Sequence, residues 1–486
     1  MRSFHTSPHI LAALSLTVLL TLFTSACGST TDRMAAARPT QVPATEGTTA
    51  IARPTQASAT GGSINAATAI ARPTEAPAAT VVPTTVPPTA TREPLRALVV
   101  KASGFGQKGK SFSYGVVIEN PNTAASLEGA ALQLVAYDEA GTMLGTEDST
   151  IPLIPPGATI HFGGSTFIDT DAPVSRVEVQ VTDEGTAKAA TPEQIPPFSV
   201  SAISFRENAI GQHVSGIVSN PFAAPLTNLY VGVVVYDSAE KIIGGGFTFL
   251  DFLLPEGKSP FVTSVTVNGT PARIEVSPIL STLTLWGQRD KEKMPPLTMI
   301  EQGGSLNGSQ IGYGIIVENP HTTQALTGSK YTIAAYANDG TVLSVESGYF
   351  GLILPGSKAV RAGTLYIDSD GVSPDRVEAI IFPGSLENAE GKLAFSIEGA
   401  TFVTGSYTSK TTGQIVNPYD KKVKNVQVNA ILRDATGKII GGGAAYSDTI
   451  PAKGKAAIEI SVAVSGEVAT TELYANEAGI TSIGDK

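Results

Sequence analysis

The sequence predicts an all-β protein made of four tandem antiparallel β-sandwich domains, and three observations support this prediction. An Asn-Pro pair closes an apolar stretch four times, with spacings of 100, 99 and 98 residues, at Asn120, Asn220, Asn319 and Asn417. Apolar and polar residues alternate after these pairs, which is typical of strands with one buried face. Charged residues make up only 16% of the chain, whereas 49 Gly and 32 Pro supply turns between strands.

The first segment has the features of a secretion signal. Arg2 precedes an uncharged run from Ile10 to Phe23, which is too short to span a membrane but suits the core of a signal peptide. Small residues then lead to Cys27, the only cysteine. With no second Cys, no disulfide can form within the chain, so its domains depend on packing.

The residues around Cys27 resemble the lipobox of bacterial lipoproteins, although Thr24 stands where that pattern prefers Leu. The resemblance implies a signal peptide over residues 1–26 and diacylglyceryl attachment to the Cys27 sulfur. It therefore implies anchoring to the cell membrane or the outer membrane, on the extracytoplasmic side. The alternative interpretation is an ordinary secretory signal followed by an unused cysteine.

Residues 27–94 are predicted to form a disordered tether. They consist mostly of Ala, Thr, Pro, Ser and Gly, and the sequence Ala-Arg-Pro-Thr recurs at Ala37, Ala52 and Ala71. Too few large apolar side chains are present to offset the entropy lost on folding. The prolines favour extended conformations, which give a reach of up to roughly 200 Å. The dense Thr and Pro also resemble O-glycosylated stalks.

The remaining chain is predicted to form four repeats, at residues 95–186, 196–287, 295–386 and 392–486. Repeats 1 and 3 match closely from Tyr114 to Pro121 and from Tyr313 to Pro320. Repeats 2 and 4 instead share the sequence Lys-Ile-Ile-Gly-Gly-Gly, which begins at Lys241 and Lys438. We therefore predict that a two-domain unit was duplicated as a whole.

The alternation of apolar and polar residues is clearest from Lys424 to Asp434. It predicts that four side chains of repeat 4 point inward, as do the aligned residues of repeat 2: Val426, Val428, Ala430 and Leu432, and Leu229, Val231, Val233 and Val235. At this size each repeat is expected to bury its own core.

These landmarks resemble bacterial FxLYD-type immunoglobulin-like domains. In that family a Gly-x-Val-x-Asn segment leads to a strand ending in Tyr-Asp, and then to a Pro-Gly corner. Repeat 2 has this pattern before Asn220, at Tyr236-Asp237 and from Pro255 to Gly257, whereas repeat 4 departs from it at Arg433, where the tyrosine is missing. The Asn-Pro and Pro-Gly cues also resemble the LEA-14/WHy domain. Both resemblances imply an immunoglobulin-like sandwich over residues 95–486 and imply little about function.

Two acidic loops are candidates for a calcium site. Asp169 and Asp171 follow the first Asn-Pro pair at the same distance as Asp368 and Asp370 follow the third. Calcium prefers six to eight oxygen ligands, and each loop offers only two neighbouring carboxylates. Asx turns explain such loops without a metal, so no metal or other cofactor is predicted.

Aromatic residues provide candidate binding surfaces. Tyr137, Tyr236 and Tyr336 fall on the face opposite the predicted core, where exposed rings would suit a glycan or a peptide strand. The alternative is that they pack on a neighbouring strand or domain. Trp286, at the end of repeat 2, is interpreted as an interdomain wedge rather than a sugar platform.

The sequence favours a protein without catalytic activity. The predicted mature chain has three histidines, His161, His213 and His321, each in a different repeat, and lacks recognisable nucleophile, zinc or phosphate-binding motifs. No Lys/Arg run is present, which argues against nucleic-acid binding. The net charge of −10 favours solubility.

The leading functional hypothesis is a lipid-anchored surface protein with a structural, scaffolding or adhesive role. Its partners would be the membrane, through the lipid, and a protein or glycan at the surface. Two alternatives are an accessory subunit of an envelope transport or secretion complex and, by analogy with WHy domains, an envelope stress-protective protein.

Overall fold

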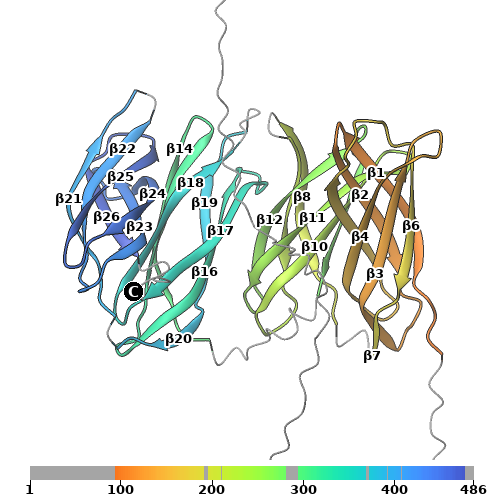
Figure 1. The fold of residues 1–486 in the computed structure, drawn as a ribbon, viewed down its shortest axis with the longest axis horizontal. Helices are drawn as coiled ribbons and strands as arrows, with labels where there is room; N and C mark the ends of the chain where they lie inside the picture. Colours follow the sequence, from red (N-terminus) through yellow and green to blue (C-terminus); the bar gives the residue numbers. More distant parts are fainter. Residues whose placement is uncertain are drawn as a thin grey trace, which may run out of the picture. The chain divides into compact units, whose positions relative to one another are not determined.

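A computed structural model describes residues 94–190, 195–208, 211–280, 294–367, 372–390, 392–406 and 408–476. The strands in these residues form antiparallel sheets, which confirms the predicted all-β fold of tandem β-sandwiches (Figure 1). The predicted signal peptide and Cys27 lie outside the described residues, as does the predicted tether up to residue 93. Within the described ranges, no helix has the length and apolarity needed to cross a membrane.

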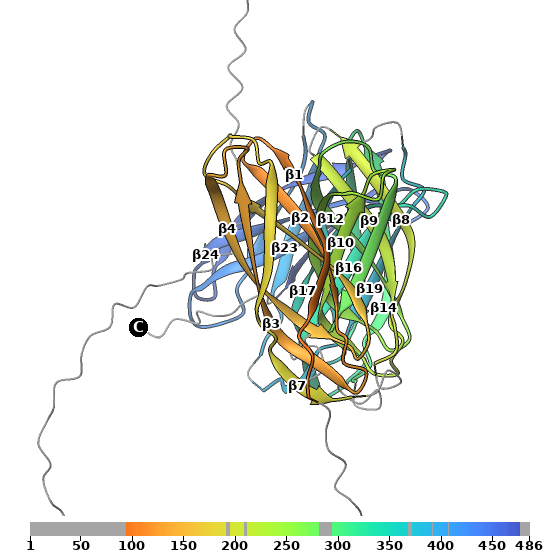
Figure 2. The ribbon, with the colours of Figure 1, turned by 90° about the vertical axis from the view of Figure 1, so that its right-hand side faces the viewer.

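Repeats 1 and 3 each consist of two separate sheets. Repeat 1 pairs β1-β2-β5 in one sheet and β4-β3-β6 in the other, with β7 beside β3. Figure 2 labels β1, β2, β3, β4 and β7 of this repeat. Repeat 3 has the same order, β14-β15-β18 and β17-β16-β19, with β20 beside β16. The strand bounds are β1 Val99–Lys108, β2 Ser111–Glu119, β3 Ala125–Tyr137, β4 Met143–Ile154, β5 Thr159–Phe167, β6 Arg176–Asp183, β7 Thr186–Ala189, β14 Thr298–Asn307, β15 Gln310–Glu318, β16 Gln324–Tyr336, β17 Val342–Ile353, β18 Lys358–Tyr366, β19 Arg376–Phe382 and β20 Ser385–Asn388.

Repeats 2 and 4 join their strands into one six-stranded path. The orders are β13-β10-β11-β12-β9-β8 and β21-β22-β25-β24-β23-β26. In each case a short pairing closes the path, Gly244 and Gly245 with β12 and Gly441 and Gly442 with β25. The strand bounds are β8 Ser199–Asn208, β9 Gly211–Ser219, β10 Leu226–Tyr236, β11 Ile242–Leu253, β12 Lys258–Val267, β13 Arg273–Ile279, β21 Ser396–Val403, β22 Ser409–Val416, β23 Val423–Arg433, β24 Ile439–Ile450, β25 Lys455–Val464 and β26 Thr470–Asn476.

The asparagine of each Asn-Pro pair joins two loops of its own repeat. Asn319 is fully buried, and its Nδ2 donates to the carbonyl oxygens of Gln324 at 2.9 Å, Ile353 at 3.1 Å and Leu354 at 3.2 Å. Its Oδ1 accepts from the backbone N–H of His321 at 3.0 Å. Asn120, Asn220 and Asn417 make equivalent bonds. A buried amide with all these partners explains why the motif recurs near the proline-marked corner.

The inward-facing residues predicted for β23 and β10 do lie in the cores of repeats 4 and 2. The opposite faces of both strands are also buried, which the alternation did not predict. Tyr230 and Val234 in β10, and Asn429 and Ile431 in β23, are at most 5% exposed. The preceding repeat covers these faces, because β10 contacts β2 and β5, and β23 contacts β15 and β18.

Each repeat has its own buried cluster, and some of these clusters also include residues of the neighbouring repeat. Tyr230 and Ile279 of repeat 2 belong to the buried cluster of repeat 1, and Leu153 of repeat 1 belongs to that of repeat 2. Residues of repeats 3 and 4 likewise share a cluster around Ile316 and Ile431. Repeats 1 and 2 therefore pack as one pair and repeats 3 and 4 as another, and a smaller cluster packs Tyr336 of repeat 3 against Ile217 and Val262 of repeat 2.

Candidate functional site

The two interfaces within these pairs are the most unusual parts of the described structure. We call the interface of repeats 1 and 2 the first seam, and that of repeats 3 and 4 the second seam. Strands β2 and β5 pack on β10 and β11 at the first seam, and β15 and β18 pack on β23 and β24 at the second. Figure 1 shows the β1, β2, β10 and β11 strands side by side.

Glycines bring the two backbones into direct contact at each seam. A Cβ atom placed on Gly163 would lie 2.7 Å from the backbone nitrogen of Gly246, and one on Gly245 would lie 2.9 Å from the carbonyl carbon of Tyr114. At the second seam, a Cβ on Gly312 would lie 2.6 Å from the carbonyl carbon of Ala463. Cβ atoms in proteins essentially never approach other atoms within 3.0 Å. The Lys-Ile-Ile-Gly-Gly-Gly sequences of repeats 2 and 4 therefore mark surfaces that the preceding repeat covers.

Polar groups of the even-numbered repeat also cover an open sheet edge of the odd-numbered one. The backbone N–H of His161 in β5 donates to Ser277 Oγ at 2.9 Å. At the second seam the backbone N–H of Ala362 in β18 donates to Asn429 Oδ1 at 3.1 Å. Strands β5 and β18 each pair with only one neighbour, so these contacts satisfy backbone groups that would otherwise be open to another chain.

Arg433 shows why repeat 4 lacks the tyrosine expected at the end of this strand. Its guanidinium is 13% exposed, and its Nη1 donates to both carboxylate oxygens of Glu301 in repeat 3, at 2.7 and 2.8 Å. Its Nε also donates to Glu472 at 3.0 Å. The hydrogen bond with Glu301 is the main reason that the pKa of Arg433 is raised further above its usual value. Arg433 thus forms an ion pair across the second seam.

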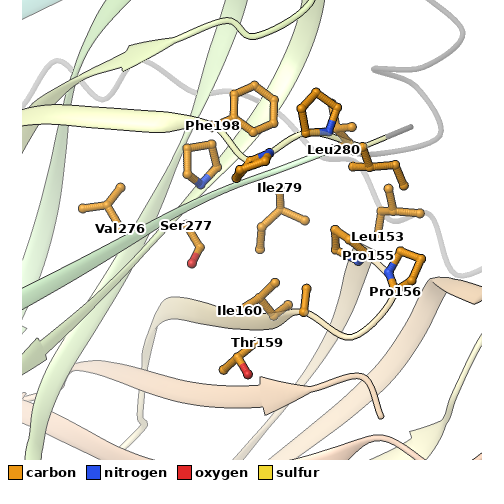
Figure 3. A pocket seen from close by; sticks show the side chains of 15 residues that line it. Leu153, Pro155, Pro156, Thr159, Ile160, Phe198, Val276, Ser277, Ile279 and Leu280 are labelled. Atoms are coloured by element: carbon orange, nitrogen blue, oxygen red, sulfur yellow. The ribbon is translucent and has the colours of Figure 1, made fainter. Parts of the chain in front are cut away.

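A cavity of about 320 Å³ lies at the first seam (Figure 3). Its walls come from the corner between Leu153 and Ile160, from residues 195–198 before β8, and from Val276 to Leu280 at the end of β13. None of the fifteen described residues that line it carries a charge, and five of them are proline. The labelled side chains carry oxygen only on Thr159 and Ser277 (Figure 3).

A second, smaller cavity of about 170 Å³ occupies the equivalent place at the second seam. Phe395 lines it where Phe198 lines the first cavity, each just before the first strand of its repeat. The other walls differ, because Lys358 and Tyr474 stand where the first cavity has Thr159 and Ser277. The two repeat pairs therefore share the cavity framework but not its chemistry.

A half-buried carboxyl group, that of Glu346, lies inside repeat 3. Tyr313 donates to Glu346 Oε1 at 2.7 Å, and the hydroxyl of Tyr331 lies 3.3 Å from the same oxygen. Burial raises the pKa of Glu346 above its usual value, while the two tyrosine hydroxyls lower it. Burial, and then the nearby Glu346 charge, raise the pKa of Tyr331 to about 12. These groups are bonded to one another within the core and do not line any cavity that we describe.

Arg361 is a buried cation at the second seam. It is 4% exposed, and its Nε and Nη1 atoms have no hydrogen-bond partner among the described residues. Its pKa is lower than the usual value for arginine, mainly because the side chain is buried. Phe162 occupies the equivalent position at the first seam, where its ring stacks on Tyr230 with centroids 5.2 Å apart.

The tyrosines predicted as exposed binding residues are mostly covered. Tyr236 and Tyr336 are 5% and 6% exposed, because packed neighbours cover the faces that the alternation had placed toward solvent. Tyr137 is half-buried. An arginine guanidinium stacks on each ring, at 4.0 Å from Tyr137, 3.8 Å from Tyr236 and 4.5 Å from Tyr336. The expectation of an exposed aromatic surface was thus wrong for Tyr236 and Tyr336, and the alternative of packing is what the structure shows.

The other sequence-predicted residues lie apart from one another. Asp169 and Asp171 are exposed, and no group of three or more His, Cys, Asp or Glu side chains suited to a metal gathers among the described residues. Asp368, Asp370 and Trp286 lie outside those residues.

The three histidines are spread over three repeats. His161 is part of the first seam, where its ring lies edge-on to Tyr236 at 6.4 Å, and burial lowers its pKa. His213 in β9 contacts Ser264, with its Nδ1 3.5 Å from the hydroxyl. His321 follows the third Asn-Pro pair.

Sequence reasoning missed both cavities. The first one is lined by the Pro-Gly corner, by residues 195–198 and by the end of β13, and none of these segments carries a sequence motif of a binding site. The repeated Gly-Gly-Gly sequence was the one available signal of the seams, since three glycines within a strand suggest close approach of another backbone.

Comparisons with known proteins leave the family of the chain open. No protein-family model matches it, and no curated protein matches it. Among solved structures, a cryo-EM reconstruction of the native conformation of E. coli alpha-2-macroglobulin matches at 10% sequence identity with a TM-score of 0.12. That match covers 74% of this chain and 27% of the macroglobulin chain.

Proposed function

We propose that this protein is a lipid-anchored extracytoplasmic surface protein with a structural, scaffolding or adhesive role and without catalytic activity. In this proposal the lipid on Cys27 holds the chain at a membrane, the tether provides reach, and the repeats act as a stiff spacer and contact surface. The support for anchoring is the lipobox resemblance around Cys27 and the composition of residues 27–94.

The observation that carries the structural role is the backbone contact at both seams. Glycines such as Gly163 and Gly312 allow two sandwiches to pack without intervening side chains, which leaves little freedom for one repeat to move against the other. Shared clusters such as that around Ile316 and Ile431 couple the paired repeats further. A two-repeat unit of this kind resists bending, which is the property a surface spacer needs.

Replacement of Cys27 by alanine tests the anchoring part. We expect the wild-type protein in the membrane fraction and the Cys27→Ala variant in the medium or the soluble fraction. Thr24→Leu is the matched control, because it moves the sequence toward the lipobox pattern and should leave the protein in the membrane. Membrane retention of Cys27→Ala would contradict lipid anchoring.

Chemical crosslinking in intact cells, followed by mass spectrometry, tests the role of the repeats. Crosslinks to several surface components, spread over the repeats, are expected for a scaffold or adhesive protein. A single partner captured in constant ratio would contradict this role and favour the accessory-subunit hypothesis.

A further inference from the structure

The first cavity combines uncharged walls with few hydrogen-bond donors. Five of its fifteen lining residues are proline, and proline has no backbone N–H to offer. Of the two hydroxyl-bearing side chains, Ser277 already interacts with His161: its Oγ accepts from the backbone N–H at 2.9 Å and lies 3.4 Å from the ring Nδ1. A charged ligand would lose its hydration without compensation there, and a peptide backbone would leave its own polar groups unpaired. An uncharged, mostly apolar molecule loses the least hydration free energy when it enters the cavity.

The size of the cavity limits the ligand to a small molecule. At about 320 Å³ it lies at the lower end of the range of ligand pockets, roughly 300–1,000 Å³. It is about twice the volume of an apolar cavity of ~150 Å³ that binds benzene. Two aromatic rings or a short alkyl chain would therefore fill it.

The equivalent cavity at the second seam shows that the repeat framework alone does not produce these properties. There the volume is about 170 Å³, and Lys358 and Tyr474 replace Thr159 and Ser277. The second cavity is therefore smaller and has a cation at its wall. Within one chain, the same framework thus occurs with an apolar lining and with a partly polar lining, and the second serves as an internal reference for the first.

We propose that the cavity at the first seam binds a free, uncharged apolar small molecule of about two rings or an equivalent alkyl chain. The ring of Phe198 and the side chains of Ile160, Val276 and Ile279 would supply the apolar contacts. Binding there would involve both repeats of the first pair, because Ile160 belongs to repeat 1 and the other three residues belong to repeat 2. This proposal does not depend on the lipid anchor or on the surface role.

Fluorescence titration of the purified full-length protein with 6-propionyl-2-(dimethylamino)naphthalene, an uncharged, environment-sensitive probe with two fused aromatic rings, tests the proposal. We expect saturable binding to one site, and displacement of the probe by free 1-octanol. Phosphatidylcholine vesicles, added as a lipid source, should compete only by taking up the probe. Absence of saturable binding overturns the proposal. If vesicle lipid displaces the bound probe while the concentration of free probe stays constant, the claim that the ligand is a free molecule is overturned.

Substitutions taken from the second cavity locate the site. Ser277→Tyr introduces the residue found at Tyr474 and should weaken probe binding at least about tenfold by filling the space. If Ser277→Tyr lowers the unfolding temperature markedly, Thr159→Lys provides the second test, because Thr159 is exposed at the rim and the lysine occurs naturally at position 358. Lys358→Thr is the matched control and should leave binding unchanged. Equal binding by the wild type and the folded first-cavity variants overturns the assignment.

Discussion

Replacement of Gly245 by alanine should loosen the first seam while leaving the second intact. The added Cβ would lie 2.7 Å from the carbonyl oxygen of Val233 and 2.9 Å from the carbonyl carbon of Tyr114. Both contacts are with backbone, which cannot rotate away as a flexible side chain can. Strand β11 must therefore shift away from repeat 1, and the shift disturbs the contacts along the whole seam.

The expected cost follows from the measured effects of overpacking. Inserting a methyl group into a well-packed interior costs about 1–3 kcal/mol. Alanine lowers the conformational entropy of the unfolded chain relative to glycine. This effect stabilises the folded state by about 0.4–1 kcal/mol, but only where the native site accepts a side chain. We expect a net loss of about 1–2 kcal/mol, and a repeat pair of this size loses about 2–4 °C in unfolding temperature per kcal/mol.

Calorimetry combined with hydrogen exchange measures both the size and the place of the effect. We expect a lower transition temperature and faster exchange of amides in β2 and β11, with unchanged exchange in β15 and β24. Thr248→Ala is the matched control, because alternation along β11 points Thr248 away from the face that Gly245 presents to repeat 1. An unchanged transition temperature together with unchanged exchange in β2 and β11 would refute the argument that backbone contact requires glycine here.

Three further substitutions test individual buried groups. Asn319→Asp replaces the donor that bonds three carbonyl oxygens, so a loss of at least about 3 kcal/mol is expected in urea denaturation at pH 7; an unchanged midpoint would contradict the role given to the motif. Glu346 has a raised pKa in the fold, so its stabilising contribution is complete below the unfolded-state pKa of about 4.3 and is lost as pH rises through the folded-state pKa. Glu346→Gln, which keeps an acceptor for Tyr313, should therefore gain unfolding free energy relative to wild type between pH 4 and pH 7, and an equal difference at both pH values would argue against the shift. Arg361→Phe introduces the residue of the equivalent position, Phe162, and should raise stability by about 1–3 kcal/mol, because two unpaired guanidinium nitrogens leave the interior; a lower unfolding temperature would show that Arg361 has partners outside the described residues.

Features that depend on neighbouring residues in the sequence were predictable. The alternation from Lys424 to Asp434 gave the correct inward face of β23, because strand geometry fixes side-chain direction by position alone. The Asn-Pro pairs gave the repeat period, and the structure supplies the reason in the bonds that each buried asparagine makes. Both features are local to one repeat.

Features that depend on how repeats pack were not predictable from the alternation. Tyr236 was placed correctly on the face opposite the core, but nothing in its own strand says that another repeat covers that face. A further signal was present, since the stretch from Leu229 to Tyr236 is apolar at nearly every position, as expected for a strand covered on both sides. The first cavity gave no such signal, because its walls come from three separate segments and become a site only when two repeats meet.

The glycine-lined seams also constrain how this architecture changes length over evolution. An odd-numbered repeat separated from its successor would expose the open edge of β5 or β18 and a strip of bare backbone to other chains. Loss or gain of one repeat would therefore favour aggregation more than loss or gain of a pair, because a complete pair keeps its seam covered. Descendants of such a gene should consequently carry even numbers of these sandwiches, and their lengths should differ by multiples of one pair.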